Sequence, residues 1–292
     1  MKIEPGKTCI GFAGLGVMGK SMAGHILDAG YELHVYTRTK SSADELISRG
    51  CIWENSVREL AQACEAVITI VGFPDDVKQI YFGKDGLLAN MDAGNIVIDM
   101  TTSSPELAVR IYDEARNAGI MALDAPVSGG DLGARNATLS IMAGGDEKAF
   151  SYALPLFEVM GKNIVFQGGP GAGQHTKMAN QIAIAAGMVG VCESIAYAEK
   201  AGLDPENVLK SIGSGAAGSW SLNNLGPRMI KKDFEPGFYI KHFIKDMKIA
   251  ARSSEQMGLY TPGLELALSL YGKLAAKGFE NKGTQALFSL FD

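Results

Sequence analysis

The stretch Gly14-Leu15-Gly16-Val17-Met18-Gly19 decides the fold, because it joins an apolar, strand-like run to a helical pattern. Gly14 allows a tight turn, Gly16 lets the backbone approach a pyrophosphate, and Gly19 permits close packing of helix on strand. The N-terminus of the following helix offers its unpaired N–H groups to the anion. A second strand-like run at 32–36 completes a βαβ unit within about 30 residues, as this fingerprint requires. The stretch therefore predicts a dinucleotide-binding Rossmann unit whose loop residues contact the cofactor.

Short β-branched runs alternate with longer helical patterns from residue 8 to about residue 165. This alternation is typical of βαβ units in a largely parallel sheet. Consecutive apolar positions in several runs indicate strands that helices cover on both faces. The predicted strands span 9–13, 32–36, 66–71, 95–99, 121–124, 139–143 and 163–166.

After the last predicted strand, apolar residues recur at the three- and four-residue spacing of helices. The glycine-rich segment 168–174 is expected to be a loop that opens a long helix, which runs to about Lys200. We therefore predict an α/β Rossmann domain at 1–167, which binds the cofactor. An all-α C-terminal domain at 168–292 would follow it and serve substrate binding and oligomerisation.

The composition is that of an ordinary globular protein. Apolar residues make up 47% and charged residues 20% of the chain, which excludes disordered and collagen-like classes. A net charge of -5 provides no positive field for nucleic acid or for an anionic membrane. The apolar segment 182–191 is interrupted by glycines and is too short to span a membrane. The sequence thus predicts a soluble protein with neither nucleic acid nor membrane as partner.

Cysteine and histidine side chains are potential metal ligands. The cysteines are Cys9, Cys51, Cys64 and Cys192, and the histidines are His25, His34, His175 and His242. The cysteines lack CxxC spacing and the histidines are widely dispersed, so neither a metal site nor a disulfide framework is predicted. This use of cysteine favours a reducing, cytoplasmic location.

The residues after the second predicted strand bear on the choice of cofactor. An NAD-specific site carries Asp or Glu there to bind the ribose 2'-hydroxyl, whereas this chain has Thr37-Arg38-Thr39. The Arg38 guanidinium can pair bidentately with a 2'-phosphate, and Thr37 or Thr39 can add a hydroxyl donor. NADP(H) is therefore the preferred cofactor, and NAD(H) remains the alternative if Arg38 is only a solvated loop residue.

Two further segments carry groups suited to chemistry. Ser128-Gly129-Gly130 follows a predicted strand and can present a hydroxyl and backbone N–H groups to a carboxylate, although alone it could be only a turn. Lys177, Asn180 and Gln181 have the spacing of one helix face. Most helix lysines are simply solvated. A lysine whose pKa burial lowers, however, can protonate the alkoxide formed when hydride reaches a carbonyl, or accept the hydroxyl proton in the reverse direction.

Four motifs, which follow one another in order over nearly the whole chain, make the sequence resemble the β-hydroxyacid dehydrogenases. This family includes 3-hydroxyisobutyrate dehydrogenase, tartronate semialdehyde reductase and the glyoxylate/succinic semialdehyde reductases. The motifs read GLGVMG at 14–19, DAPVSGG at 124–130, GAGQHTKMANQ at 171–181 and FYIKHFIKD at 238–246. The resemblance implies a soluble homodimer or homotetramer that acts on a small carboxylate-bearing aldehyde, oxo acid or hydroxy acid.

The resemblance also implies roles for individual residues. Lys177 resembles the family's acid/base, and Ser128 with Gly129 resembles its clamp for the substrate carboxylate. Many members carry Asn where this chain has Gln181, so either Asn180 or Gln181 would orient the substrate. The remaining implied contacts are Phe238 and Asp246 on the substrate side, and Phe73, Pro74, Thr102 and Lys245 on the cofactor side.

There are three alternative interpretations of the sequence. A 6-phosphogluconate dehydrogenase pairs its lysine with a histidine–asparagine step and has a longer C-terminal region, whereas Met178-Ala179-Asn180-Gln181 follows the lysine here. An imine reductase usually replaces the lysine, which this chain retains. A non-catalytic, nucleotide-sensing scaffold would bind NADP without turnover and would not need Lys177. The sequence leaves the substrate open among succinic semialdehyde, glyoxylate, tartronate semialdehyde and methylmalonate semialdehyde.

Overall fold

The computed structural model describes residues 3–291. The chain divides into two compact units, an N-terminal unit, Met1–Lys177, and a C-terminal unit, Met178–Asp292. The division falls inside α9 (Ala172–Lys200), later than the predicted boundary at 167/168. The difference arises because the first residues of α9 are bonded to the sheet of the N-terminal unit.

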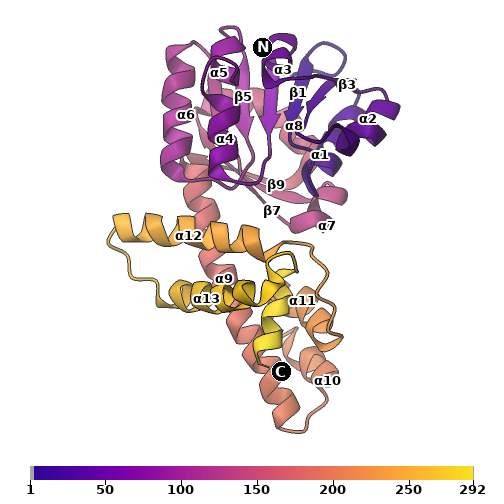
Figure 1. Cartoon of the computed structure of the whole chain (residues 1–292), viewed down its shortest axis with the longest axis vertical. Coiled ribbons are helices and arrows are strands. Elements are labelled where there is room, and N and C mark those ends of the chain that lie inside the picture. The colour runs from indigo at the N-terminus through magenta and orange to yellow at the C-terminus, as the bar shows by residue number, and fades with distance from the viewer. Residues whose placement is uncertain (1–2, 292) are drawn as a thin grey trace. The chain divides into compact units, whose positions relative to one another are not determined.

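The N-terminal unit is built on one nine-stranded sheet (Figure 1). Its strand order is β3-β2-β1-β4-β5-β6-β8-β7, and β9 pairs with β8. The pairs from β3 to β6 are parallel, whereas β8 runs antiparallel to β6 and to β7. The strands are β1 (Cys9–Ala13), β2 (Glu32–Tyr36), β3 (Ile52–Trp53), β4 (Ala66–Thr69), β5 (Ile96–Asp99), β6 (Met121–Asp124), β7 (Val127–Ser128), β8 (Leu139–Gly145) and β9 (Gly161–Gly168). The order 3-2-1-4-5-6 is that of the Rossmann fold, so the predicted fold class is confirmed.

All seven predicted strands are present, three of them (β1, β2 and β6) with the predicted ends and four with changed ends. β4 is shorter than predicted, β5 begins one residue later, and β8 and β9 extend beyond their predicted ends. Two strands were missed, β3 and β7, because each has only two residues and leaves no periodic pattern. The predicted loop at 168–174 is also too long, since β9 reaches Gly168 and α9 begins at Ala172.

Helices pack on both faces of this sheet (Figure 1). Ile68 and Ile98 point into a core shared with α1 and α8, whereas Val67 and Val97 point into a core shared with α3 and α6. Strands covered on both faces are apolar at successive positions, which explains the continuous apolar runs in the sequence. The helices are α1 (Gly19–Asp28), a 3-10 turn (Lys40–Ala43), α2 (Asp44–Ser48), α3 (Val57–Ala63), α4 (Pro74–Tyr81), α5 (Leu87–Asn90), α6 (Pro105–Asn117), α7 (Gly130–Arg135) and α8 (Glu147–Met160).

The C-terminal unit is helical in its described residues. Its core joins Cys192 of α9, Phe243 of α12 and Tyr271 of α13, and the rings of Phe243 and Tyr271 meet edge to face with centroids 5.1 Å apart. After α9 it contains α10 (Pro205–Ile212), α11 (Trp220–Ile230), α12 (Ile240–Gln256), α13 (Pro262–Leu274), a π-helical turn (Ala275–Phe279) and a 3-10 helix (Thr284–Leu290).

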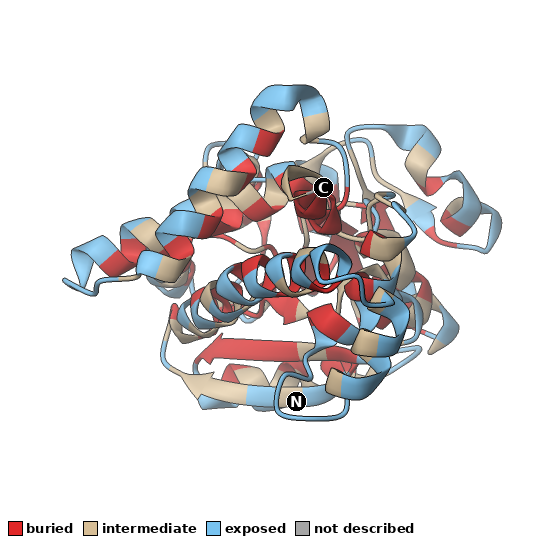
Figure 2. Cartoon of the chain, turned by 90° about the horizontal axis from the view of Figure 1, so that it is seen from below, coloured by how far each residue is buried: buried red, intermediate tan, exposed pale blue. Residues whose placement is uncertain are grey.

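Helix α9 is long and apolar enough to cross a membrane by length and composition. The sequence prediction concerned only its segment 182–191, which is too short to do so. The most apolar stretch of α9 is 44% buried inside the protein. Ala185, Met188 and Cys192 of this helix lie in the core of the C-terminal unit, and Figure 2 shows buried positions distributed through the helices and strands. Helix α9 therefore contributes these side chains to the core of the C-terminal unit.

Two buried polar side chains fasten the start of α9 to the carboxyl ends of β5 and β6. Asp124 accepts hydrogen bonds from the backbone N–H of Gly171 at 2.9 Å and of Gln174 at 2.8 Å. The Gln174 side chain donates to Thr101 O at 2.7 Å and accepts from Ser103 N–H at 3.0 Å. Both carboxylate oxygens of Asp124 and both polar atoms of the Gln174 amide therefore have hydrogen-bond partners, as buried polar groups require.

Asp124 yields a prediction about stability and pH. Burial raises its pKa from 3.8 to about 6, although the bonds from Gln174 and Gly171 oppose the rise. The folded state therefore binds this proton more tightly than the unfolded state, and the stability contribution of Asp124 falls as pH rises from about 4 to 6. Asp124→Asn should abolish this part of the pH dependence in urea unfolding. At pH 7.5 it should also cost about 1–3 kcal/mol, because its amide faces an N–H donor.

Asp92→Asn is the matched control, since Asp92 is an exposed aspartate of the same unit. This variant should follow the wild-type pH profile of unfolding. If Asp124→Asn follows it as well, the raised pKa of Asp124 is refuted.

Candidate functional site

The predicted cofactor residues lie in loops at one edge of the sheet. The glycine stretch follows β1, Thr37–Thr39 follows β2, Phe73 and Pro74 follow β4, and Thr102 follows β5. Because β2, β1, β4 and β5 are parallel neighbours, their carboxyl ends meet at the same edge. The strand order reverses between β1 and β4, and open α/β sheets bind ligands at such a point.

The three glycines of the first loop differ in their surroundings. Gly14 has φ +105°, and a Cβ there would collide with Ile70 O. A Cβ on Gly19 would collide with Gly14 O, so the turn and the helix contact both require glycine. Gly16 instead faces open space, with no positive φ and no atom within 4 Å of the position that a Cβ would take. Of the intervening residues, Leu15 is buried, Val17 is exposed and Met18 packs partly on the core.

Arg38 lies beside the loop that follows β4. Its Nη1 donates to Asp76 Oδ1 at 3.0 Å, and Asp76 Oδ2 accepts from Phe73 N–H at 3.0 Å. Asp76 thus links the loops after β2 and β4 across the end of β1. The Arg38 side chain is 76% exposed, and a guanidinium has five N–H donors, so it can receive a further anionic partner.

A buried network fixes the loop that leads to Thr102. Asp99 accepts from the Thr69 hydroxyl at 2.8 Å and from Thr101 N–H at 3.0 Å. The Thr101 hydroxyl accepts from Val71 N–H at 3.0 Å. Hydrogen bonds therefore hold the backbone shortly before Phe73 and directly before Thr102.

Lys177 is buried against the strand that carries Ser128. Its Nζ donates to Val127 O at 2.9 Å, and only 7% of the residue is exposed. Ser128 ends β7, and Gly129 and Gly130 follow with φ of +126° and +62°, backbone conformations that favour glycine. The interpretation of Lys177 as a solvated helix lysine is wrong, because the fold places its ammonium beside the Ser-Gly-Gly turn.

A second polar group lies within the C-terminal unit. Gln181 is 1% exposed, and its Nε2 donates to Asp246 Oδ2 at 2.6 Å. Asn180 Nδ2 donates to Gln181 Oε1 at 2.7 Å. The other carboxylate oxygen of Asp246 forms an ion pair with Lys245 Nζ at 2.9 Å. Gln181 is therefore a buried connector of Asn180 and Asp246, while Asn180 is only partly buried.

Phe238 precedes α12 and is partly buried. Its ring packs against Phe243, with centroids 5.7 Å apart. The structure thus places Phe238, Lys245 and Asp246 in the C-terminal unit and the glycine loop, Arg38, Ser128 and Lys177 in the N-terminal unit.

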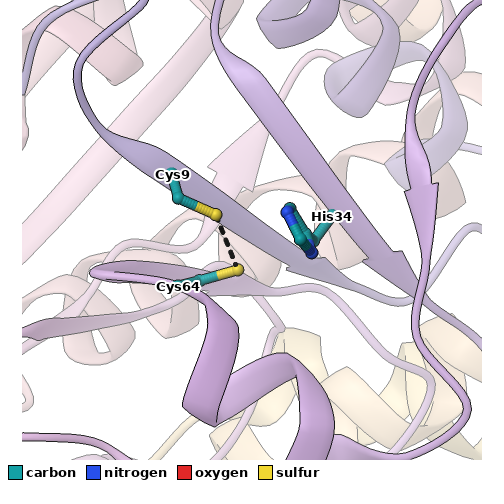
Figure 3. A group of neighbouring side chains, drawn as sticks. All are labelled: Cys9, His34 and Cys64. Atoms are coloured by element: carbon teal, nitrogen blue, oxygen red, sulfur yellow. Dashed lines mark hydrogen bonds between the residues drawn. The ribbon is translucent and has the colours of Figure 1, made fainter.

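The sequence did not predict one cluster of potential metal ligands that the structure contains. Cys9, His34 and Cys64 were expected to be too dispersed to form a ligand set, yet one ligand atom from each lies within 4.8 Å of the others. Figure 3 shows the two thiols and the imidazole turned toward one another. The signal was present, since Cys9 begins β1, Cys64 lies just before β4, and these strands are parallel neighbours. Pairing them required the sheet topology, which the spacing along the chain does not reveal.

Two family descriptions match consecutive parts of the chain. Residues 9–169 match the NAD-binding domain of 6-phosphogluconate dehydrogenase, and residues 171–291 match the NAD-binding domain of NADP-dependent 3-hydroxyisobutyrate dehydrogenase. Together they cover both units.

Individual relatives align over nearly their full length. An uncharacterized oxidoreductase of Bacillus subtilis is 58% identical over 98% of this chain and 99% of its own. The 2-hydroxy-3-oxopropionate reductase of Escherichia coli is 40% identical over 92% of both chains. A solved structure of Mycobacterium tuberculosis 3-hydroxyisobutyrate dehydrogenase with L-serine is 30% identical, with a TM-score of 0.88 over 97% of this chain and 98% of that chain.

The open space at Gly16 provides a test of the cofactor loop. Gly16→Ala should fold normally, because the added methyl meets no protein atom. It should nevertheless weaken NADPH binding roughly 10- to 100-fold, the equivalent of about 1.5–3 kcal/mol for a lost bond to a charged phosphate. Fluorescence titration with NADPH measures the affinity, and thermal unfolding checks the fold.

Gly187→Ala serves as the control, because this glycine of α9 also has open space around it and lies outside the loop. Equal NADPH affinity in both variants would show that the Gly16 backbone does not approach the cofactor.

Proposed function

Since the chain belongs to the β-hydroxyacid dehydrogenase family and is an NAD(P)-dependent hydroxyacid dehydrogenase, we propose that it interconverts a small semialdehyde or oxo acid and its hydroxy acid, with NADP(H) preferred. Lys177 acts as the general acid/base, and Ser128 with Gly129 binds the substrate carboxylate. The observation that carries the proposal is the bond from Lys177 Nζ to Val127 O, the residue directly before Ser128.

The residues at the sheet edge fit a dinucleotide. The backbone at Gly16 is open to a pyrophosphate, and Arg38 with Thr37 or Thr39 can hold a 2'-phosphate. Phe73, Pro74 and Thr102 follow neighbouring strands at the same edge, and Lys245 completes the proposed cofactor contacts. When bound, the nicotinamide supplies or accepts the hydride.

This chain's own residues orient the substrate and move the proton. The Ser128 hydroxyl and the N–H groups of Gly129 and Gly130 bind the carboxylate and so fix the carbonyl beside Lys177. In the reducing direction the Lys177 ammonium gives a proton to the carbonyl oxygen as the hydride arrives at carbon. In the oxidising direction the neutral amine takes the hydroxyl proton. Positioning and one proton transfer are therefore what the protein contributes.

The burial of the two amides favours different tasks for them. Asn180 lies one helical turn after Lys177 and is partly exposed, so it is the amide proposed to contact substrate. Gln181 is buried between Asn180 and Asp246 and is proposed to hold that amide in place. Phe238 and Asp246 are proposed to line the substrate site. Asp246 would act there through its hydrogen bond with Gln181.

The names of relatives guide the choice of substrates. The Escherichia coli relative is a reductase of 2-hydroxy-3-oxopropionate, and the Mycobacterium tuberculosis structure carries L-serine. Both compounds are three-carbon carboxylates with an oxygen function beside or near the carboxylate, which suits the Ser-Gly-Gly clamp. The substrate proposed here is of this class. A cytoplasmic location and a homodimer or homotetramer stay predictions.

The role of Lys177 is tested by steady-state NADPH oxidation with tartronate, succinic and methylmalonate semialdehydes and glyoxylate. Lys177→Ala should lower kcat by about 10²–10⁴-fold on the best substrate, the usual contribution of general acid–base catalysis. NADPH affinity, measured separately, should change little.

Lys200→Ala is the control, because Lys200 is an exposed lysine at the end of the same helix. Normal turnover by Lys177→Ala would refute the acid/base assignment. NADPH binding by the wild type without turnover of any acid would instead favour the nucleotide-sensing scaffold.

Arg38→Ala tests the cofactor preference. Loss of charge-assisted bonds worth about 1.5–3 kcal/mol should lower the NADPH-over-NADH ratio of kcat/KM roughly 10- to 100-fold. NADH kinetics should be nearly unchanged. Arg49→Ala, which removes an exposed arginine paired with Asp28, should keep the wild-type ratio. An unchanged ratio in Arg38→Ala would remove the basis for NADP preference.

A further inference from the structure

We propose that Cys9, His34 and Cys64 form a binding site for a zinc ion at the amino ends of the central strands, with the Glu32 carboxylate as fourth ligand. The site lies within the N-terminal unit and uses none of the residues assigned above to cofactor or substrate. Its three ligand residues come from β1, β2 and the segment just before β4 (Figure 3).

The ligand atoms are already close together. One atom from each of the three residues lies within 4.8 Å of the others, and the thiols of Cys9 and Cys64 are hydrogen-bonded at 3.2 Å. Tetrahedral zinc with Zn–S bonds of about 2.3 Å would place the two sulfurs about 3.8 Å apart. The thiols therefore need to separate by roughly half an ångström. Loss of their shared proton on binding removes the bond that now holds them together.

The imidazole of His34 has a carboxylate at each nitrogen. Nδ1 lies 2.6 Å from Glu54 Oε1, and Nε2 lies 3.2 Å from Glu32 Oε1. Metal-binding histidines characteristically bond their second nitrogen to a carboxylate, which fixes the ring. Glu54 is 15% exposed and suits that supporting role, whereas Glu32 is 63% exposed and can turn toward a metal.

The distance between Nε2 and Glu32 also fits a shared metal. Zinc bonds of about 2.0 Å to nitrogen and oxygen would set these atoms about 3.3 Å apart in a tetrahedron. The 3.2 Å observed between His34 Nε2 and Glu32 Oε1 is close to this value. This pair of atoms therefore already has the spacing that a shared zinc ion requires.

The chemistry of the group selects zinc among common cations. Two thiolates and an imidazole are soft and borderline ligands, which Mg²⁺ and Ca²⁺ avoid and Zn²⁺ prefers. Cys9 is only partly buried, which leaves the site an approach from solvent.

Bound zinc would join three adjacent strands at the edge opposite the cofactor loops. Its expected effect is therefore on stability rather than on turnover, because a ligand of the folded state raises the unfolding temperature. The pair of thiols has one rival use, oxidation to a disulfide, which would need no histidine and no metal.

The test uses the full-length chain, reduced, treated with a chelator and desalted. Co²⁺ serves as the optical probe, since tetrahedral thiolate coordination gives intense visible bands and a near-ultraviolet charge-transfer band. We expect one Co²⁺ per chain, full displacement by one Zn²⁺, and a higher unfolding temperature with Zn²⁺.

The ligand variants are Cys9→Ser, Cys64→Ser and His34→Gln, and the matched control is Cys51→Ser, a buried cysteine of the same unit outside the cluster. Each ligand variant should lose the charge-transfer band or bind Zn²⁺ at least tenfold more weakly. Cys51→Ser should bind as the wild type does. Glu54→Gln should weaken Zn²⁺ binding roughly 10- to 100-fold, as loss of a supporting carboxylate does. Cys9 is the least buried of these three residues, so Cys9→Ser keeps the test valid if Cys64→Ser does not fold.

Two results would overturn the proposal. One is the absence of stoichiometric Co²⁺ and Zn²⁺ binding by the reduced wild type. The other is equal Zn²⁺ affinity in Cys9→Ser and Cys51→Ser. A reduced chain that takes up no metal, but whose Cys9 and Cys64 form a disulfide in air by peptide mass mapping, would assign the pair to redox chemistry instead.

Discussion

The buried carboxylate of Asp124 is the interaction on which the proposed active site depends. It lies at the end of β6 and binds the backbone of Gly171 and Gln174, so it joins the end of a strand to the first turn of α9. A carboxylate removed from water is costly unless its oxygens are hydrogen-bonded, and here both are. Gly144 and Gly173 leave no room for a side chain beside it. The start of the helix is therefore restricted to one position on the sheet.

That restriction determines where the lysine lies. Gln174, in the first turn of the helix, binds the backbone on both sides of Thr102, and Lys177 follows one turn later against Val127 O. Because residues three apart share one face of a helix, fixing the position of Gln174 also fixes the position of Lys177. The loop after β5, proposed to line the cofactor, and the proposed proton donor are thus fixed by the same short segment.

Much of this arrangement was predictable from the sequence. The glycine stretch and the apolar runs specify the sheet because helix and strand periodicities are local, and all the longer strands were predicted. What could not be predicted are pairings between distant residues. β7 consists of Val127 and Ser128 alone and exists only because β8 accepts it. The residues Gln181 and Asp246, which are hydrogen-bonded, lie 65 positions apart, and the sequence around either residue does not predict the pairing.

The departure at Gln181 shows how such a pairing changes the interpretation of a motif. By spacing, Asn180 and Gln181 were equivalent candidates for contact with substrate. Burial separates them: an amide that is 1% exposed and bonded to a buried carboxylate has little capacity left for a ligand. The longer glutamine side chain reaches Asp246 and still accepts a bond from Asn180. Because a buried Asp246 must be paired, the interior of the C-terminal unit requires Gln181. Asn180 is therefore the amide that we propose for the contact with substrate.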